Sequence, residues 1–220
     1  MSRPFHKPVL LVEGEGDKEA VGKLIPLTLN QLGIKGIHPA RNPIKVGDIP
    51  KLEREGELEK FVHYACTRRD GDSVLLVVDC DDACPLEVVR AFSQRIQRMH
   101  RPEEKPVGIV FFHREFETLF LFSLPTLAEQ FPDYRWQLES FDVEKDMEEI
   151  RGAKEQLSGL MGSSKRYKPT RDQTRLLAGL DWERLRSNSR SFQHFEKTLL
   201  WLAGRHRREL SIYPAVKSTS

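Results

Sequence analysis

Cysteines and long apolar runs are scarce in this sequence, and their scarcity excludes several classes of protein. The 220 residues contain only three cysteines, an odd number that does not suit a disulfide framework. Cys80 and Cys84 have no pair of histidines near them in sequence, so they match a zinc site poorly. No apolar run approaches the roughly 20 residues of a membrane-spanning helix, and the N-terminal segment is unlike a signal peptide. We therefore expect a cytoplasmic protein in a reducing compartment, with no membrane contact.

Repeats and a nucleotide-binding loop are missing as well. The sequence contains no internal repeats, no low-complexity tracts and no Gly-x-x-x-x-Gly-Lys-Ser/Thr phosphate loop, so any ATP-driven step would require a separate protein. A chain of this length can bury a substantial core, as one large domain or as a core with an appended subdomain.

Apolar runs and helical periodicity alternate over the first half of the chain. Residues 9–13, 73–79 and 107–112 are predicted to be buried strands, and residues 34–40 a short second strand, with Pro26 kinking or ending the first helix. This order favours an α/β fold with a mostly parallel, four-stranded sheet and helices on both of its faces.

The pattern changes after residue 113. From there the spacing predicts a helical elaboration, with a loop over 132–142 and another over 162–172. We therefore divide the chain into an α/β core, residues 1–113, and a helical elaboration with a basic loop, residues 114–220, packed on that core. The helices are expected at residues 119–127, 147–160, 176–185 and 192–202.

Carboxylates follow two of the predicted strands directly. Glu13 comes after the first strand, and Asp79 and Asp81 end the strand at 73–79. Ligands bind at the carboxyl ends of strands in open α/β sheets, and Mg²⁺ prefers oxygen ligands. Because side chains alternate along a strand, Asp79 and Asp81 should point the same way and Cys80 toward the other face. A divalent-cation site at this edge is the functional interpretation, and solvated loop carboxylates are the alternative.

A third acidic segment follows the strand at 107–112. Glu115 and Glu117 share a face if the strand continues, whereas in a helix they diverge by about 200° and only one can point inward. We choose Glu115 as the site residue, with a salt bridge to Arg114 as the alternative. His113 could bind phosphate, although a single histidine at a strand end is more often structural.

These segments resemble a known domain. A Glu-Gly turn after the first strand and an Asp-x-Asp after a later one are similar to the Toprim domain of topoisomerases, DnaG-type primases and overcoming-lysogenization-defect (OLD) nucleases. More narrowly, residues 77–85, 114–121, Tyr167-Lys168 and Phe192 resemble a bacterial Toprim-like family, domain-of-unknown-function family 4276. That similarity covers nearly the whole chain.

The resemblance implies roles for particular residues. Glu13 matches the Toprim glutamate, a general acid/base or metal ligand, and Asp79 and Asp81 match the metal-binding pair, which would hold Mg²⁺ or Mn²⁺. Asp17 resembles the extra carboxylate of the nuclease branch and would support a second ion, about 3.5–4 Å from the first. A helix cap is the alternative reading of Asp17.

Charge is unevenly distributed along the chain. Residues 1–150 contain 20 Lys and Arg against 27 Asp and Glu, a balance of −7, whereas residues 151–220 contain 15 against 6, a balance of +9. An acidic half joined to a basic half suits a phosphodiester substrate. The candidate nucleic-acid contacts are Lys165, Arg166, Tyr167, Lys168 and Arg171.

Two of these residues have more specific interpretations. Tyr167 could stack on a base or pack back on the core. Lys165, which we also count among the catalytic candidates, could neutralise charge on the scissile phosphate. A second basic cluster, 205–208, is better explained by the C-terminus of a helix.

We therefore expect a Mg²⁺-dependent nuclease that hydrolyses nucleic acid, with DNA as the first choice. The resemblance implies a role in anti-phage genome defence beside an AAA- or ABC-type ATPase partner. Whether the chain forms a homo-oligomer stays open. The alternatives are a non-catalytic module that binds nucleic acid or protein, and a small-molecule phosphohydrolase with Asp79 as nucleophile and Asp81 as acid.

Overall fold

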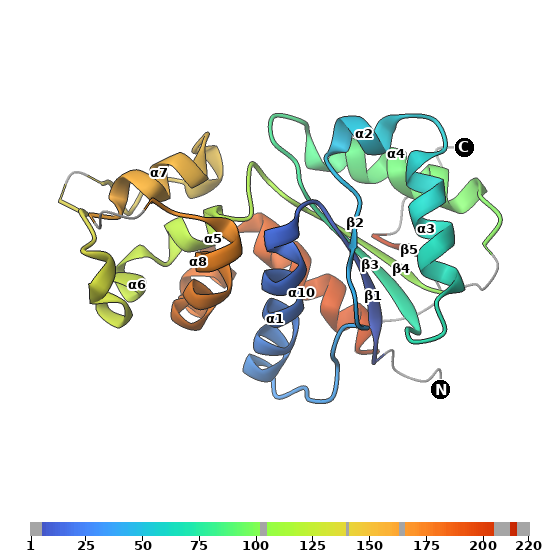
Figure 1. Cartoon of the computed structure of the whole chain (residues 1–220), viewed down its shortest axis with the longest axis horizontal. Coiled ribbons are helices and arrows are strands. Elements are labelled where there is room, and N and C mark those ends of the chain that lie inside the picture. Colours follow the sequence, from blue (N-terminus) through green and yellow to red (C-terminus); the bar gives the residue numbers. More distant parts are fainter. Residues whose placement is uncertain (1–5, 102–104, 140, 163–165, 205–211, 215–220) are drawn as a thin grey trace.

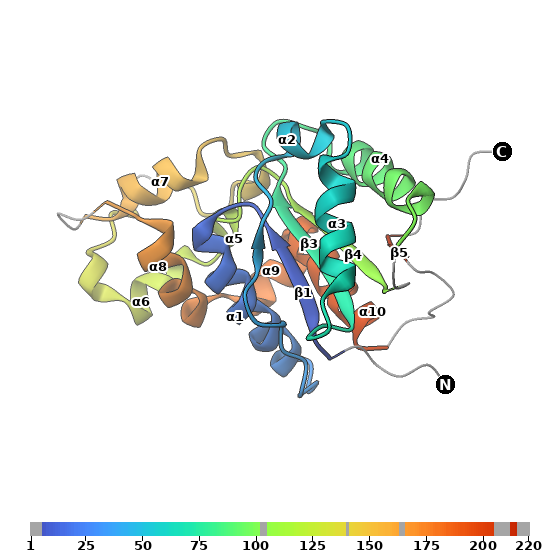
Figure 2. The ribbon, with the colours of Figure 1, turned by 45° about the vertical axis from the view of Figure 1, so that its right-hand side comes forward.

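A five-stranded, all-parallel sheet forms the centre of the α/β part of the protein, and the helical elaboration extends to one side of it (Figures 1 and 2). The structure is a computed structural model and describes residues 6–101, 105–139, 141–162, 166–204 and 212–214. The strands run in the order β2-β1-β3-β4-β5. They are β1 (Pro8–Val12), β2 (Ile44–Lys45), β3 (Ser73–Asp79), β4 (Val107–Phe112) and β5 (Ile212–Tyr213).

The α/β class is confirmed, while the expected number of strands is wrong. We predicted four mostly parallel strands, and the sheet has a fifth, β5, which pairs with Val107 and Gly108 of β4. Every pairing in the sheet is parallel. A two-residue strand is too short to produce a hydrophobic pattern, so only its tertiary pairing reveals it.

Helices cover both faces of the sheet, as expected. Along β3, Leu75 and Val77 face one hydrophobic cluster, while Leu76 and Val78 face another, because side chains alternate along a strand. The first cluster lies under α1 (Glu15–Gln31) and α10 (Arg190–Leu202). The second lies under α2 (Ile49–Glu53), α3 (Glu57–Thr67) and α4 (Pro85–Arg98).

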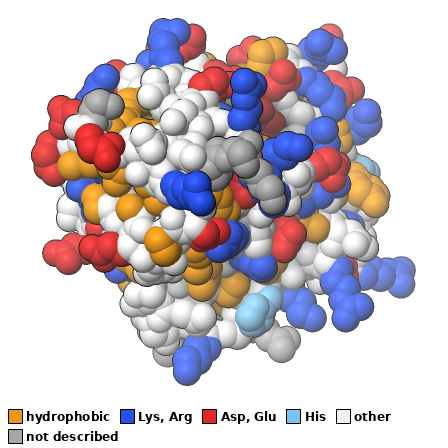
Figure 3. Space-filling view, turned by 60° about the vertical axis from the view of Figure 1, so that its left-hand side comes forward, with side chains coloured by type: hydrophobic (Ala, Val, Ile, Leu, Met, Phe, Trp, Pro, Cys, Tyr) orange, Lys and Arg blue, Asp and Glu red, His pale blue; other side chains and the backbone are white. Residues whose placement is uncertain are grey.

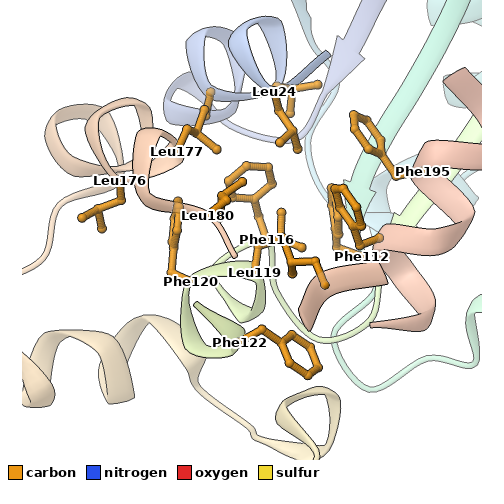
Figure 4. Close-up of a cluster of buried hydrophobic side chains, with 14 of the residues drawn as sticks. Leu24, Phe112, Phe116, Leu119, Phe120, Phe122, Leu176, Leu177, Leu180 and Phe195 are labelled. Carbon is orange, nitrogen blue, oxygen red and sulfur yellow. The ribbon is translucent and has the colours of Figure 1, made fainter. Parts of the chain in front are cut away.

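The helical elaboration shares the first cluster with the sheet. Figure 4 shows Phe116, Phe120 and Leu180 gathered beside Leu24 of α1 and Phe195 of α10. The apolar core therefore continues from the sheet into the elaboration. The elements of the elaboration before α10 are α5 (Thr118–Phe122), α6 (Leu124–Gln130), α7 (Ala153–Leu160), α8 (Pro169–Leu176), α9 (Trp182–Asn188) and the short 3-10 turns η1 (Pro132–Tyr134), η2 (Met147–Glu149) and η3 (Leu177–Gly179).

Several local predictions need correction. The second strand is Ile44–Lys45, not 34–40; within 34–40, His38 and Ala40 donate single backbone hydrogen bonds to His6, just before β1, and to Pro8. Of the two effects expected of Pro26, a kink or an end, the helix does not end there, and residues on both sides of Pro26 are buried. The predicted loop over 162–172 is shorter, since α8 already begins at Pro169, a residue that suits the first turn of a helix.

The predictions on cysteines and membrane contact concern parts of the chain that are described. All three cysteines are free: Cys66 and Cys80 are buried and Cys84 is exposed. In the described ranges, no helix is both long and apolar enough to cross a bilayer.

The strand order fixes where a ligand can bind. The chain runs from β1 outward to β2 and then returns to β3 on the other side of β1. The carboxyl ends of β1 and β3 therefore form a topological switch point, the position at which open α/β sheets bind their ligands.

We expect the shared apolar core to dominate the stability of the molecule. Phe120 is fully buried, so Phe120→Ala should lower the free energy of unfolding by about 3–5 kcal/mol. Leu86 is 75% exposed, and Leu86→Ala should change it by less than about 0.5 kcal/mol. Urea denaturation of both variants measures the difference, and equal effects would contradict a continuous core.

Candidate functional site

Glu13 stands at the switch point, directly after β1. Its Oε2 accepts a hydrogen bond of 3.1 Å from the backbone N–H of Asp79. Burial raises the pKa of Glu13 above its ordinary value, and that hydrogen bond opposes the rise only in part. The contact joins the carboxyl ends of two neighbouring strands.

Asp79 is the last residue of β3 and is only 8% exposed. Its Oδ1 accepts a hydrogen bond of 2.9 Å from the backbone N–H of Phe116. Its Oδ2 lies 3.5 Å from the Nζ of Lys154. Burial, followed by the charge of Glu117, raises the pKa of Asp79 well above its usual range. Asp79 is therefore a carboxylate held in place by the helical elaboration.

Glu117 completes the centre of the site, although we chose Glu115 from the sequence. It is fully buried before α5, and its Oε1 accepts hydrogen bonds from Tyr167 Oη at 2.8 Å and Gln173 Nε2 at 3.1 Å. Its Oε2 lies 3.7 Å from Lys154 Nζ and has no hydrogen-bond partner among the described residues. Burial raises the pKa of Glu117 to about 7, although Lys154 and Tyr167 act in the opposite direction.

Lys154 provides the positive charge between these carboxylates. It lies in the first turn of α7, where its backbone N–H donates a hydrogen bond of 2.8 Å to Glu115 Oε2. Burial alone would lower the pKa of Lys154, but the charges of Glu117 and Asp79 outweigh it and raise that pKa. Glu115 thus holds the start of α7 and orients Lys154.

Asp17 lies at the edge of this network. It is the third residue of α1, and its Oδ2 accepts a hydrogen bond of 2.8 Å from the N–H of Gly14. The N-cap is therefore Gly14 and not Asp17, the alternative that we left open, although Asp17 helps to satisfy the start of the helix by bonding back to Gly14. Its Oδ1 also accepts from Gln173 Nε2 at 3.2 Å, which connects Asp17 to Glu117.

Asp81 occupies a different environment from Asp79. The strand ends at Asp79, and Asp81 has a positive φ of 41°, so strand alternation does not extend to it. Its side chain is exposed, although its charge contributes to the raised pKa of Glu13, after burial. Cys80 does face the opposite cluster, as predicted. Next to Asp81, Asp82 pairs with Arg114 and, at 2.7 Å, with Arg151.

The basic loop lies beside the site, but only part of it is described. Lys165 lies outside the described residues, as do 205–208. Arg166 and Lys168 are exposed, whereas Arg171 is bonded to Asp172 at 2.7 Å. On the face in Figure 3, Lys and Arg side chains are interspersed with Asp and Glu.

Tyr167 packs back on the core, which is the alternative that we had left open. Its ring is 8% exposed and belongs to the first hydrophobic cluster. Burial, followed by the charge of Glu117, raises the pKa of its hydroxyl. With the ring buried, Tyr167 holds Glu117 in place and is not presented for stacking on a base.

Sequence reasoning missed Lys154 and Gln173, and it weighed Glu117 but chose Glu115. The signal for Glu117 was its place directly before the apolar segment 119–122. Lys154 and Gln173 lie in ordinary amphipathic helices, and their sequences carry no comparable signal.

The cluster offers oxygen ligands, and its centre is filled by an ammonium group. Across the described ranges, no three His, Cys, Asp or Glu side chains are placed as a ready metal site. However, Glu117 Oε2 and Gln173 Oε1 are buried acceptors that no described donor satisfies. An all-oxygen set of this kind fits a hard cation such as Mg²⁺, provided that the ammonium of Lys154 moves aside.

Comparison with protein families identifies the family of this chain. The model of the family described as Domain of unknown function (DUF4276) matches residues 12–200. The chain belongs to this family. No curated protein and no solved structure matches it. The DUF4276 match starts one residue before Glu13 and ends within α10, so it includes the whole acidic cluster.

The raised pKa of Glu117 predicts a pH dependence of stability. Between pH 4.5 and 7 the folded state binds this proton more tightly than the unfolded chain, so stability falls as pH rises through that window. The neutral amide in Glu117→Gln removes this dependence. From pH 5 to pH 8, the wild type should lose roughly 1–3 kcal/mol of unfolding free energy relative to Glu117→Gln.

Urea denaturation at several pH values measures this difference. Glu129→Gln, which alters an exposed carboxylate of α6, is the matched control and should follow the wild type. Parallel curves for the wild type and Glu117→Gln would show that Glu117 does not retain its proton in the folded protein.

Proposed function

We propose that this DUF4276 protein is a divalent-metal-dependent phosphodiesterase that hydrolyses nucleic acid. One observation carries the proposal: Asp79 and Glu117 are buried together at the switch point of the sheet, with Glu13 and Asp17 close by. Carboxylates this close repel one another unless a cation offsets their charge. Burying them is costly for stability alone, which favours a functional reason.

The residues have distinct parts in this proposal. Asp79, Glu117 and Glu13 would hold the cation, with Asp17 at the edge and exposed Asp81 within reach of solvent. A bound Mg²⁺ or Mn²⁺ polarises the phosphoryl oxygen and lowers the pKa of a water molecule. Glu13, with its raised pKa and partial exposure, is the residue best suited to take a proton from that water.

Lys154 has two states in this proposal. In the structure described here its ammonium neutralises Asp79 and Glu117. When it moves aside, the same ammonium is available to a phosphate oxygen of the substrate. Lys154 thus takes the role that the sequence suggested for Lys165.

The resemblance to Toprim nucleases agrees with this arrangement. Glu13 directly follows β1, and Asp79 ends the adjacent parallel strand β3, which is compatible with a Toprim-like site. Three parts of the proposal come from the resemblance alone. They are the choice of DNA, the setting in genome defence and the separate ATPase partner.

A non-catalytic binding module is the second candidate. It is favoured by the ion pairs themselves, because Lys154 already neutralises two carboxylates without a metal. A phosphohydrolase with Asp79 as nucleophile is less well supported, since both oxygens of Asp79 already face donors, Phe116 and Lys154.

Cleavage assays separate these candidates. We expect the purified protein to cut plasmid DNA, single-stranded DNA or structured RNA with Mg²⁺ or Mn²⁺ and not with EDTA. Asp79→Asn keeps the acceptor for Phe116 but loses the charge, so cleavage should fall on the order of 100-fold or more. Glu129→Gln should retain full activity. Nucleic-acid binding without cleavage, unchanged in Asp79→Asn, would favour the binding module.

Competition between Lys154 and the metal gives a test that needs no substrate. Lys154→Met removes the ammonium and keeps most of the aliphatic stem, so Mn²⁺ should bind on the order of tenfold more tightly, about 1.4 kcal/mol. Without metal, the variant should lose about 1–3 kcal/mol of unfolding free energy, because two buried carboxylates lose their partner. Calorimetric titration and thermal unfolding with and without Mn²⁺ measure both effects. Unchanged or weaker Mn²⁺ binding in Lys154→Met would contradict the idea that the metal ion and the ammonium of Lys154 occupy the same position.

A further inference from the structure

A cavity of about 480 Å³ lies at the carboxyl edge of the sheet, outside the acidic cluster. Its walls are formed by the first turns of α4, the end of β4, the start of α10 and the residue after β5. The volume is in the range of small-molecule sites, which are mostly apolar with a few polar groups. The residues that matter for its chemistry are Cys84, Leu86, Val89, Phe111, His113 and Arg190.

The outer edge of β4 borders this space. Among the described residues, β5 pairs only with Val107 and Gly108, and side chains of α10 contact β4 beyond that pairing. Ser191 Oγ accepts a hydrogen bond of 2.9 Å from the N–H of His113, and His194 Nε2 lies 3.0 Å from the carbonyl oxygen of Ile109. These two side chains hold α10 against the outer edge of β4, where a further strand would otherwise pair. Both residues also line the cavity.

The cavity is a close neighbour of the acidic cluster, at the outer edge of β4 between α4 on one face of the sheet and α10 on the other. His113 follows Phe112, the register partner of Asp79. Phe111 and Val89 belong to the second hydrophobic cluster, opposite the side of Asp79 and Glu117. A ligand that reaches both sites therefore has to pass over the carboxyl ends of β3 and β4.

The apolar part of the wall suits a flat ring. Leu86 is 75% exposed, and it stands beside Val89 and Phe111 on the cavity wall. An exposed leucine of this kind gains from contact with an apolar ligand face. Nucleobases present such faces and carry hydrogen-bonding atoms on their edges.

The polar part of the wall includes groups that have no described partner. Among the described residues, no partner reaches the buried Nδ1 of His113 or the backbone N–H of Leu86 in the uncapped first turn of α4. The side chain of Arg190 is 69% exposed and also lines the cavity. A helix N-terminus and an arginine together favour a phosphate.

The acidic residues of the wall do not cancel this preference. Glu148 is 1% exposed, and its carboxylate already accepts hydrogen bonds from Ser189, Ser191 and Arg190. Glu149 and Asp146 are largely exposed, and each lies 3.8 Å from the Arg190 guanidinium. The Arg190 side chain is 69% exposed beside them and so stays accessible to a ligand.

We propose that this cavity binds one nucleotide of the nucleic-acid substrate, with the base against Leu86, Val89 and Phe111 and a phosphate at the first turn of α4 and Arg190. The inference rests on the proposed function for the source of that nucleotide. A base can enter the cavity only when it is not paired with a complementary strand. The site therefore favours single-stranded or locally opened substrates.

Cys84 gives a direct test, because it lines the cavity and is exposed, whereas Cys66 and Cys80 are buried. The rate of alkylation by neutral iodoacetamide would be measured in EDTA on the full chain, in wild type and in Asp79→Asn. Mononucleotides at millimolar concentration should slow the reaction at least fivefold in both proteins. Inorganic phosphate and ribose 5-phosphate should slow it far less. Cys84→Ser should show no fast reaction and serves as the blank.

Leu86→Glu is the matched variant. Its exposed position keeps the fold intact, while a carboxylate at the cavity wall repels phosphate and removes the apolar contact. With each rate compared to the same protein's unprotected rate, the mononucleotide concentration that half-protects Cys84 should be at least tenfold higher in this variant than in the wild type. A short single-stranded oligonucleotide should protect the wild type at a lower concentration than the mononucleotide.

Several results would overturn the site. They are the absence of mononucleotide protection, equal protection by inorganic phosphate, or protection by oligonucleotides alone, which would mean that only the strand backbone passes over Cys84. The outcome is separable from that of the proposed function. Protection without metal-dependent cleavage keeps the cavity and refutes the nuclease, whereas cleavage without protection does the reverse.

Discussion

The burial of two carboxylates around one ammonium group is the interaction on which the rest of this structure depends. Asp79 and Glu117 are buried away from water at the end of the sheet. Among the described residues, Lys154 provides the positive charge that faces both of them. Attraction within a buried ion pair rarely exceeds the cost of removing its members from water. The arrangement persists because the surrounding backbone holds each group in place: Phe116 donates to Asp79, and Glu115 accepts from the N–H of Lys154.

This network also joins the sheet to the helical elaboration. Glu117 receives hydrogen bonds from Tyr167 and Gln173, and Gln173 bonds in turn to Asp17 in the first turn of α1. Segments that are more than one hundred residues apart thus meet at one point. The elaboration therefore supplies half of the site, and the α/β core alone would leave Asp79 without its counter-charge.

The same edge of the sheet has two different surfaces. On one side, buried carboxylates surround the ammonium of Lys154, and the proposed metal chemistry requires a divalent cation to take its place. On the other side, a largely apolar cavity lies between α4 and α10. In the part of the chain that the structure describes, β5 pairs with only the first two residues of β4, and the second surface lies at the outer edge of β4 beyond that pairing. A strand of nucleic acid that crosses this edge would meet both surfaces in turn.

The sequence by itself determined the parts of the molecule that depend on local pattern. The bounds of the strand at 73–79 and of the strand at 107–112 follow from apolar runs, and the places of Glu13 and Asp79 follow from the ends of such runs. Only the tertiary structure decided that Glu117 points inward in place of Glu115 and that β5 joins the sheet. Lys154 is 75 positions beyond Asp79 in the chain, and no periodicity encodes a contact over such a separation. It forms because the whole chain buries one continuous core, and that packing brings distant residues to the same edge.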